Sequence, residues 1–486
     1  MINFLSSELM SHFFLLKFRL VSGSFGLIQT VSAGLKISLA IYITGLIIAL
    51  LFMFSAIYSD QNKESKIFTF SIIMIYSVGL LTRLFTSVIF EGHPVDISCF
   101  KAWASSASNS MSTFYTNGAF ADYPPLYIYV LFFVERIRLL FFHASPDWVH
   151  TLIIKLPSII GDLLCSYVLY KFTLKNQGKK FALILSFVYL FNPVTILVSC
   201  IWGQVDGLFM LLLVLATMRL YDKNYIEATV WYALTVLFKP QGLIFLPVLF
   251  FVIVKEKNIK LLGKCFVAGI ITFVLPLIPF TGSQRFDWIF KLYFNTATSY
   301  KGASLNAYNL FALLGANWKD DSEKLFIFNY GTWGMIFIVL VTIVTAWYIL
   351  TSKNPAIPTS SSAMLIAGVY VLSSKMHERY IFPVLLLLLL ACAISRNKKL
   401  LLLYSGFTIT AFLNILQVFT LSQNNIYWVP ANDPVLRAVS LINLVLMLIT
   451  FIITIKCSYK NNKEISFKSD KIKSTYYYNF KKKGIR

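Results

Sequence analysis

The sequence predicts an all-α, polytopic transmembrane protein, and composition is the first reason. The chain has 486 residues, of which 57% are hydrophobic and 13% are charged, and its mean hydropathy is +0.71. Soluble domains carry about 25% charged residues, so this chain could not hide its apolar surface in a water-soluble core. Apolar runs of about 20 residues, long enough to cross a membrane as helices, recur along it. The period-two alternation of a membrane β-barrel is absent from the sequence.

The N-terminal part divides into a mixed segment and two spans. Residues 1–36 intersperse basic residues with Phe and Leu, which favours an amphipathic segment at the membrane interface. Residues 37–58 form the first clear apolar span, and residues 67–90 form a second one that Arg83 interrupts. We therefore expect the membrane domain to begin at residue 37.

The segment 124–142 is apolar enough to be taken for a span, but its charges argue otherwise. Glu135, Arg136 and Arg138 lie within one helical turn. Three ionisable side chains are expensive near the middle of a bilayer. We expect this segment to be an amphipathic helix lying on the membrane interface.

The positions of the basic residues set the expected topology, because short loops rich in Lys and Arg mark the cytoplasmic side. If 124–142 does not cross, the basic clusters fall inside and most acids fall outside. The basic clusters are 171–180, 255–264, 396–399 and the tail 457–486. This topology has about 13 spans (12 to 14) in a domain covering 37–456, with outer loops at 91–150 and 281–330.

The net charge of +22 does not indicate nucleic-acid binding, because the bases are concentrated in the short loops and the tail. Such positions are typical of topology signals that also favour anionic lipid headgroups. We expect membrane lipids, and no nucleic acid, as partners. The six cysteines contain no CxxC pair and most lie in apolar runs, which argues against a disulfide framework or a zinc site.

Several polar clusters interrupt the apolar runs and are candidates for chemistry. They are HPVD with Asp96, ADYPP with Asp122 and Tyr123, WGQVD with Gln204 and Asp206, FKPQG with Lys239, and KMHERY with His377, Glu378 and Arg379. Acids at an outer cavity suit general-base work or cation binding. The cations suit an anion, and at a membrane surface the expected anion is a lipid phosphate, which Arg can clamp with two hydrogen bonds. Trp103 and Tyr123 could stack on sugars or belong to an interfacial aromatic belt.

Each cluster also has a structural interpretation. Asp122 before Tyr-Pro-Pro could shape a turn, and Gln204 with Asp206 could cap the next helix. Lys239 before Pro240 could be a snorkelling anchor. The residues from His377 to Arg379 could form a local salt-bridged loop. Asp162, alone in an apolar run, could be functional or could pair with a neighbouring helix.

Taken together, these stretches resemble the GT-C superfamily of integral-membrane glycosyltransferases. They look in particular like bacterial proteins similar to GPI mannosyltransferase II, and like the dolichyl-phosphate-glucose-dependent glucosyltransferases. The resemblance runs over roughly residues 92–383. The matching residues are Asp96 with Phe100 and Trp103, Tyr115, Asp122 to Leu126, Asn192-Pro193, Trp202 to Asp206, Phe238 to Gln241 and His377 to Tyr380.

The resemblance implies an inverting transfer of a sugar from a polyprenyl- or dolichyl-phosphate donor. It places the catalytic base on Asp96 and the donor-phosphate contact on His377, with Arg379 beside it. It also implies a long first outer loop that carries interfacial helices, as the charge argument expects. The extra span at 37–58 departs from the family pattern, in which that loop follows the first helix.

We therefore expect an enzyme that moves a hexose, mannose or glucose, from a polyprenyl-phosphate donor to an acceptor hydroxyl. The acceptor is a glycan or glycolipid, and the site faces outward from a bacterial plasma membrane. Lys239 joins the donor-phosphate set, and the acceptor side or supporting positions are assigned to Trp103, Asp122, Tyr123, Gln204, Asp206 and Glu378. No cofactor is expected with certainty, and a divalent cation remains open. The alternatives are a transporter or flippase of lipid-linked glycans, and a polymerase or ligase of surface polysaccharide.

Overall fold

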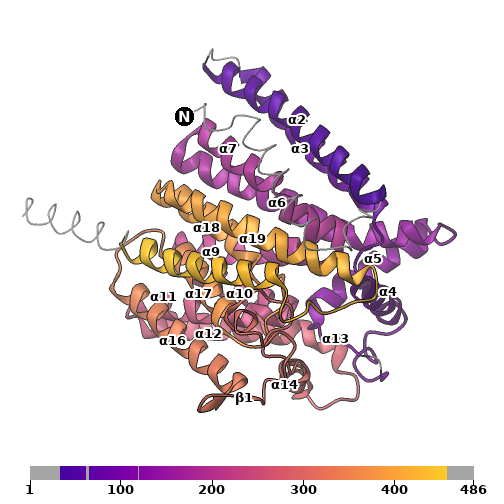
Figure 1. Cartoon of the computed structure of the whole chain (residues 1–486), viewed down its shortest axis with the longest axis vertical. Coiled ribbons are helices and arrows are strands. Elements are labelled where there is room, and N and C mark those ends of the chain that lie inside the picture. Colours follow the sequence, from indigo (N-terminus) through magenta and orange to yellow (C-terminus); the bar gives the residue numbers. More distant parts are fainter. Residues whose placement is uncertain (1–32, 62–64, 119, 457–486) are drawn as a thin grey trace, which may run out of the picture.

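The computed structural model describes residues 33–61, 65–118 and 120–456, and these are helical almost throughout (Figure 1). The described strands are two residues each, β1 (Lys324–Leu325) and β2 (Phe328–Asn329), paired antiparallel. The prediction of an all-α polytopic membrane protein is confirmed. The expected basic tail, and all but the last residues of the expected N-terminal segment, lie outside the described residues.

Eight described helices are long and apolar enough to cross a membrane. Six are α2 (Ala33–Gln61), α3 (Ser65–Ile89), α6 (Asp147–Gln177), α16 (Tyr330–Thr351), α19 (Lys399–Ser422) and a last helix, Pro434–Lys456. Two are composite: α7 (Lys179–Leu190), α8 (Pro193–Ile196) and η3 (Leu197–Trp202) form one, and α12 (Ile259–Val274), η5 (Leu275–Leu277) and α13 (Ile278–Thr281) form the other.

Four shorter apolar helices accompany them. They are α10 (Tyr225–Phe238), η4 with α11 (Pro240–Lys255), α17 (Ile357–Leu372) and α18 (Pro383–Ser395). If these cross as well, the described residues hold the lower bound of the expected 12 to 14 spans. The remaining helices are α4 (Pro94–Asn109), α5 (Pro125–Phe141), α9 (Asp206–Tyr221), α14 (Trp288–Ser299) and α15 (Leu310–Leu313).

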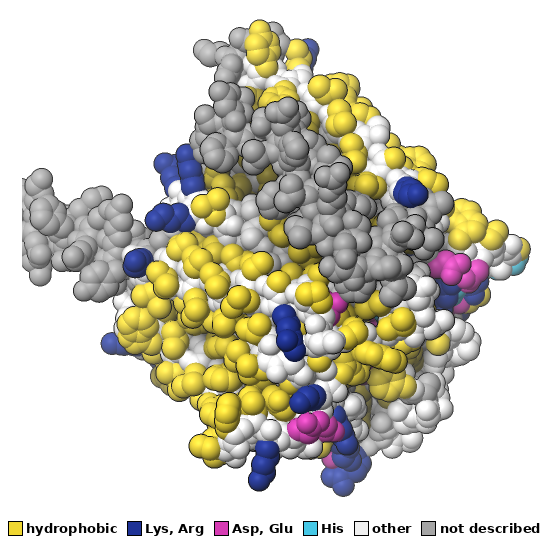
Figure 2. All heavy atoms as spheres, viewed as in Figure 1, with side chains coloured by type: hydrophobic (Ala, Val, Ile, Leu, Met, Phe, Trp, Pro, Cys, Tyr) yellow, Lys and Arg dark blue, Asp and Glu magenta, His cyan; other side chains and the backbone are white. Residues whose placement is uncertain are grey.

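Helices α17 and α18 form the buried centre, whereas α2 and α12 are peripheral. Every residue of α18 from Pro383 to Ala393 is buried, as befits a helix that is apolar on all sides. In contrast, most of α2 and α12 is not covered by the rest of the protein. Figure 2 shows hydrophobic side chains spread over one broad face of the molecule with few charges among them. Such a face suits contact with lipid.

The charged turn of α5 is neutralised locally. Glu135 is 2% exposed, and its carboxylate accepts hydrogen bonds from Arg138 at 2.7 Å and lies 3.0 Å from His150 Nε2. The 17-residue helix α5 is not among the described helices that are long and apolar enough to span. Its interfacial position stays a prediction.

Two buried cations, Lys155 and Arg83, connect neighbouring helices. The ammonium of Lys155, on α6, donates to the carbonyls of Phe90 at 2.5 Å and Cys200 at 2.8 Å. It thereby joins the end of α3 to η3, where a cation is favoured by both helix dipoles. Arg83 pairs with Asp162 at 3.4 Å, so the structural interpretation of Asp162 is the one that the contacts support.

Candidate functional site

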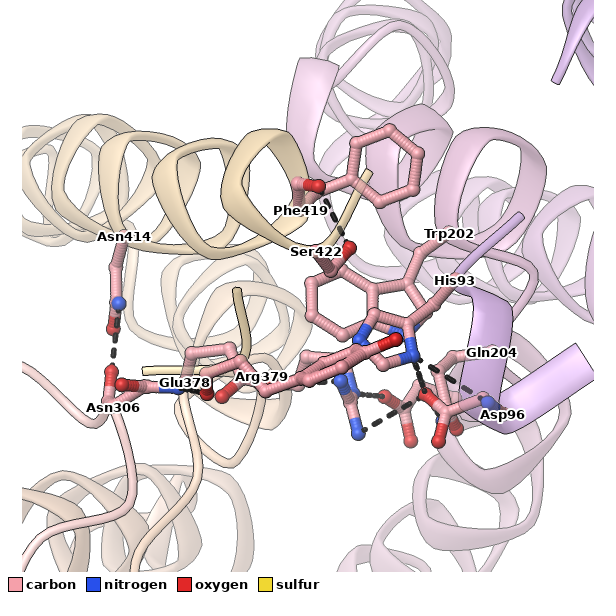
Figure 3. Close-up of polar contacts among 12 residues, drawn as sticks. His93, Asp96, Trp202, Gln204, Asn306, Glu378, Arg379, Asn414, Phe419 and Ser422 are labelled. Atoms are coloured by element: carbon pink, nitrogen blue, oxygen red, sulfur yellow. Dashed lines mark hydrogen bonds and ion pairs between the residues drawn. The ribbon is translucent and has the colours of Figure 1, made fainter. Parts of the chain in front are cut away.

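Asp96 lies in the first turn of α4, where the helix dipole favours a carboxylate. Pro94 is the first residue of the helix, and the Asp96 N–H donates to Nδ1 of the capping His93 at 3.4 Å. The Asp96 Oδ2 atom accepts hydrogen bonds from Trp202 Nε1 and Gln204 Nε2, both at 2.6 Å (Figure 3). The carboxylate is therefore oriented by two donors from a distant part of the chain.

The WGQVD stretch reaches Asp96 because the span that carries it ends in a π-helical turn, η3. Single π-turns are frequent at functional sites. Gly203 follows with φ +87°, a left-handed conformation that suits glycine. A Cβ at Gly203 would also lie 2.6 Å from Ile97 Cδ1, so glycine lets this turn approach α4 closely.

Asp206 and Lys239 form a buried ion pair beside this turn. Their side chains are 3% and 5% exposed, and Lys239 Nζ lies 2.5 Å from Asp206 Oδ1. The snorkelling interpretation of Lys239 is therefore wrong, because its ammonium points inward. Asp206 makes no side-chain capping bond to α9, so the capping interpretation is wrong as well. Gly207, next to Asp206, lets α9 pack directly against α6, because a Cβ at this position would lie 2.4 Å from the Ser158 carbonyl oxygen.

Arg379, between α17 and α18, is the centre of the charges. Its guanidinium donates to Glu378 at 2.6 Å, and lies 3.7 Å from Asp96 Oδ2 and 4.0 Å from Asp206 Oδ2. It also lies 4.3 Å from the centre of the Trp202 ring, a cation–π distance. The Nε atom of Arg379 and the Oδ2 atom of Asp206 are buried and have no hydrogen-bond partner among the described residues.

His377 and Asp122 are linked through a tyrosine from the loop after α14. The Tyr300 hydroxyl donates to Asp122 Oδ2 at 2.6 Å, and the Tyr300 ring packs edge-on against His377 with centres 5.0 Å apart. Tyr123, next to Asp122, donates to Gln204 Oε1 at 3.2 Å. Asp122 therefore lies in the same polar network and does more than shape a turn.

Trp103 has a different environment from the other predicted site residues. It is 4% exposed, and its indole N–H donates to the Phe120 carbonyl at 2.7 Å. Its ring packs against Phe100 and Tyr123. Trp103 therefore supports Tyr123 from behind and presents little surface on which a sugar could stack.

The ionisation of the site follows from burial and from Arg379. Burial alone would raise the pKa of Asp96, but Arg379, His93 and the hydrogen bonds from Trp202 and Gln204 outweigh it and hold this pKa below its ordinary value. Burial lowers the pKa of His377 to about 3, and Arg379 adds to the effect, so the imidazole is neutral at physiological pH. Burial raises the pKa of Glu378 and of Asp122. The site thus holds a firmly ionised carboxylate, Asp96, together with two acids, Glu378 and Asp122, that protonate more easily.

The loop that carries His377 is supported by the loop before α15. Leu305 N–H donates to the Met376 carbonyl at 3.0 Å, and Lys375 N–H donates to Gly302 at 3.1 Å. Asn306, which follows Leu305, has φ +62°, and its backbone carbonyl accepts a hydrogen bond from the Asn414 side chain at 2.8 Å (Figure 3). The long 281–330 region therefore positions the site from behind.

The described residues contain no group of three or more His, Cys, Asp and Glu side chains arranged to hold a metal ion. The acids lie instead beside Lys239 and Arg379, which neutralise them.

Three contributors were missed in the sequence: His93, Trp202 and Tyr300. Trp202 stands in the motif WGQVD but was not assigned to the site, and His93 precedes Asp96 by three residues, a spacing that brings side chains together at a helix start. The sequence therefore contained enough information to assign Trp202 and His93 to the site. It contained no such information for Tyr300, because its position depends on the path of a long loop.

The structure brings most of the predicted site residues together. Those joined by direct side-chain contacts are Asp96, Tyr123, Gln204, Asp206, Lys239, Glu378 and Arg379. His377 and Asp122 join them through Tyr300.

A comparison with protein families gives one match. The model of glycosyltransferase family 87 matches residues 123–374, half of the chain. The matched range includes Gln204, Asp206 and Lys239, whereas Asp96 and the His377 to Arg379 stretch flank it. No curated protein matches the chain.

Proposed function

The chain belongs to glycosyltransferase family 87, a family of membrane enzymes, and from this premise we propose that it transfers a hexose from a polyprenyl-phosphate donor. The sugar, mannose or glucose, passes to an acceptor hydroxyl with inversion at the anomeric carbon, on the outer face of a bacterial plasma membrane. The likeness to GPI mannosyltransferase II belongs to the same proposal. Family membership favours this enzyme over the transporter considered from the sequence.

Two properties of Asp96, its exposure and its lowered pKa, support its assignment as general base. Its side chain is 23% exposed, whereas the neighbouring acids Asp206 and Glu378 are 3% and 4% exposed. Its pKa is also held below the ordinary value, so it is ionised at neutral pH. A general base must be both deprotonated and within reach of the hydroxyl proton. Asp96 meets both conditions, whereas Asp206 and Glu378 are too deeply buried for a hydroxyl to reach.

The donor phosphate is assigned to Arg379 and His377, with Lys239 behind them. Arg379 carries a planar guanidinium that can pair with phosphate oxygens through two hydrogen bonds, once it gives up one of the acids beside it. His377 is neutral, so it would donate a hydrogen bond and not add charge. Lys239 is 5% exposed and paired with Asp206, so it would act on the phosphate electrostatically and without direct contact.

The reaction then proceeds in one displacement. Asp96 takes the proton of the acceptor hydroxyl as that oxygen forms a bond to the anomeric carbon. The bond between the anomeric carbon and the phosphate oxygen breaks, and its electron pair leaves with the polyprenyl phosphate. Arg379 and His377 stabilise the charge on the leaving phosphate. Asp122, Tyr123, Gln204 and Glu378 are assigned to the acceptor side or to support of these groups, and Trp103 to support of Tyr123.

The test uses purified protein in lipid nanodiscs with synthetic polyprenyl-phosphate mannose or glucose and an alkyl glycoside acceptor. Asp96→Asn should lower transfer by a factor of about 10² to 10⁴, the usual contribution of a general base. The matched control is Asp147→Asn, which removes an acid that is 75% exposed and pairs with Lys101 on the same α4. Transfer by Asp96→Asn at the rate of the unaltered enzyme would show that Asp96 is not the base.

A further inference from the structure

Lys155, on α6, is fully buried, and its ammonium binds three backbone carbonyls. It donates to those of Ser87 at 3.3 Å, Phe90 at 2.5 Å and Cys200 at 2.8 Å. An ammonium has three N–H donors, so these carbonyls use all of them. Burying a charge is costly unless it is well paired, which indicates that holding these carbonyls matters to the protein.

The three carbonyls belong to the ends of two neighbouring helices. Ser87 lies in the last turn of α3 and Phe90 follows that helix, whereas Cys200 lies in η3, two residues before its end. The last carbonyls of a helix have no partner within it, and together they carry a partial negative charge. Two such ends repel each other when they are buried side by side. Lys155 supplies the positive charge that lets them approach.

Beyond α3 the chain leads directly to the cap of α4. His93 comes three residues after Phe90, and its Nδ1 atom accepts the Asp96 N–H at 3.4 Å. The His93 N–H donates to the Trp202 carbonyl at 2.8 Å, and the two rings stack with centres 4.6 Å apart and an angle of 3°. The place of α4 relative to η3 is therefore set within a few residues of a carbonyl that Lys155 holds.

Beyond the η3 carbonyl that Lys155 binds, the chain leads to the two donors that orient the base. Trp202 Nε1 and Gln204 Nε2 each donate to Asp96 Oδ2 at 2.6 Å (Figure 3). Gly203 lies between these two donors, and a Cβ there would lie 3.1 Å from Lys155 Cε. The lysine side chain therefore packs directly against the turn that carries both donors.

A second side chain of α6 holds η3 from the same face. Ser158 lies three residues after Lys155, a spacing that puts two side chains on one face of a helix. Its hydroxyl donates to Ser199 Oγ, in η3, at 3.0 Å and accepts the Gly207 N–H at 3.2 Å. These contacts are neutral, so Ser158 holds the η3 turn without adding charge.

We propose that Lys155 is a positioning residue for the transfer reaction, which fixes the distance between Asp96 and the two donors that orient it. The proposal rests on the proposed function and adds a residue that acts on the base through Trp202 and Gln204. Loss of the ammonium would let the ends of α3 and η3 move apart, and α4 would carry Asp96 away from its donors. A displacement of about 1 Å can lower a rate about 10²-fold.

The main test is Lys155→Met, which keeps the length of the side chain and removes the ammonium. Per folded molecule, kcat should fall by a factor of about 10 to 10². The donor KM should change little, because the residues assigned to the donor phosphate belong to other elements. The hydrogen bonds from Trp202 and Gln204 help to lower the pKa of Asp96, so weakening them raises this pKa and moves the acid limb of kcat/KM to higher pH.

The matched control is Lys255→Met. The Lys255 ammonium also binds the end of a helix, since it donates to the Ile349 carbonyl at 2.6 Å and to the Ser352 carbonyl at the end of α16. None of the residues assigned to the site lies on α16. Lys255→Met should therefore cost stability and leave kcat per folded molecule and the acid limb unchanged. A Lys155→Met enzyme that matched this control in both readouts would contradict the proposal.

Ser158→Ala separates positioning from the charge of Lys155, and it decides the question if Lys155→Met does not fold. It removes one neutral hydrogen bond to η3, so kcat should fall by a factor of about 2 to 10 and the acid limb should again move to higher pH. Ser166→Ala is its control, because that hydroxyl donates to the Ser186 carbonyl at 3.0 Å, on α7. If Ser158→Ala had the kcat and acid limb of its control, positioning through η3 would be wrong.

A measurement that needs no transfer keeps the two proposals apart. Hydrogen exchange of the segments 90–96 and 198–204 should rise in Lys155→Met and not in Lys255→Met. Unchanged exchange in both segments would contradict the positioning role alone. Absence of transfer from every polyprenyl-phosphate sugar by the unaltered protein would contradict the proposed function, while hydrogen exchange would still decide whether Lys155 holds the two helix ends.

Discussion

Two buried arginines, Arg83 on α3 and Arg379 between α17 and α18, are neutralised in opposite ways. Arg83 is fully buried and faces one acid, Asp162, while its other N–H groups donate to the Gly79 and Leu190 carbonyls at 3.2 and 2.7 Å. Arg379 lies within 4.0 Å of three carboxylates and keeps an N–H without a partner among the described residues.

The difference separates a structural arginine from a functional one. Backbone carbonyls cannot move away or change their charge, so Arg83 has one arrangement. Carboxylates can exchange partners or take up protons, so Arg379 can trade one acid for another anion. Three acids around Arg379 face only two cations, counting Lys239. Because the acids already outnumber the cations, a donor phosphate can bind Arg379 only in place of one of them. We expect it to displace Asp96, which would free the base from Arg379 at the moment that it is needed.

The largest expected effect distinguishes Asp96, the acid beside Arg379, from Asp162, the acid beside Arg83. Asp96→Asn should abolish most transfer, by about 10² to 10⁴, with little change in thermal unfolding. Asp162→Asn should lower the unfolding temperature, because it leaves Arg83 buried without its charge partner. The measurement is transfer per folded molecule beside a thermal melt of each variant. A folded Asp162→Asn protein as inactive as Asp96→Asn would break the comparison.

The structural pair itself can be dissected. Arg83→Leu should destabilise the protein by about 3 to 5 kcal/mol, since removing one partner leaves a buried carboxylate unpaired. The double variant Arg83→Leu, Asp162→Leu should recover a substantial part of that loss. Denaturant unfolding in detergent measures both. If the double variant were less stable than Arg83→Leu, Asp162 would contribute to stability through contacts other than its ion pair with Arg83.

The functional arginine should reveal itself in a pH profile. Arg379→Gln removes a cation beside Asp96, so the pKa of Asp96 rises toward and above its ordinary value. Because Asp96 works as a carboxylate, activity is lost as pH falls through that pKa, and the acid limb of kcat/KM should move to higher pH. Arg379→Lys, which keeps the charge, is the control and should leave the limb in place. An acid limb at the same pH in both variants would argue against the contact.

The smallest expected effect concerns Tyr300. Tyr300→Phe removes one hydrogen bond to Asp122, worth about 0.5 to 1.5 kcal/mol. Transfer should fall by a factor of about 2 to 10, with KM for the acceptor changing more than kcat if Asp122 lies on the acceptor side. Tyr293→Phe is a matched control, because that hydroxyl donates to the Val236 carbonyl away from Asp122. Equal effects in the two variants would remove Asp122 from the acceptor side.

Composition and short motifs were enough to predict the fold class and most of the residues that meet at the site. Membrane spans are readable because the bilayer demands long apolar helices. Pairings between distant segments are not readable in this way. That Lys239 would bond Asp206, that Trp202 would hold Asp96, and that Tyr300 would connect Asp122 to His377 depends on how helices pack. The environment of Trp103 depends in the same way on packing, which a single sequence does not show.

The contact between Arg379 and the earlier acids also has a consequence for synthesis. Asp96 and Asp206 leave the ribosome long before Arg379, which follows α17. Until that loop emerges, Lys239 is the one site cation in the chain, and Asp96 must remain hydrated at the bundle end. The emergence of Arg379 therefore completes the charge balance late. A chain truncated before this residue should insert its early helices and keep α4 packed on α5, and yet leave Asp96 without its cation.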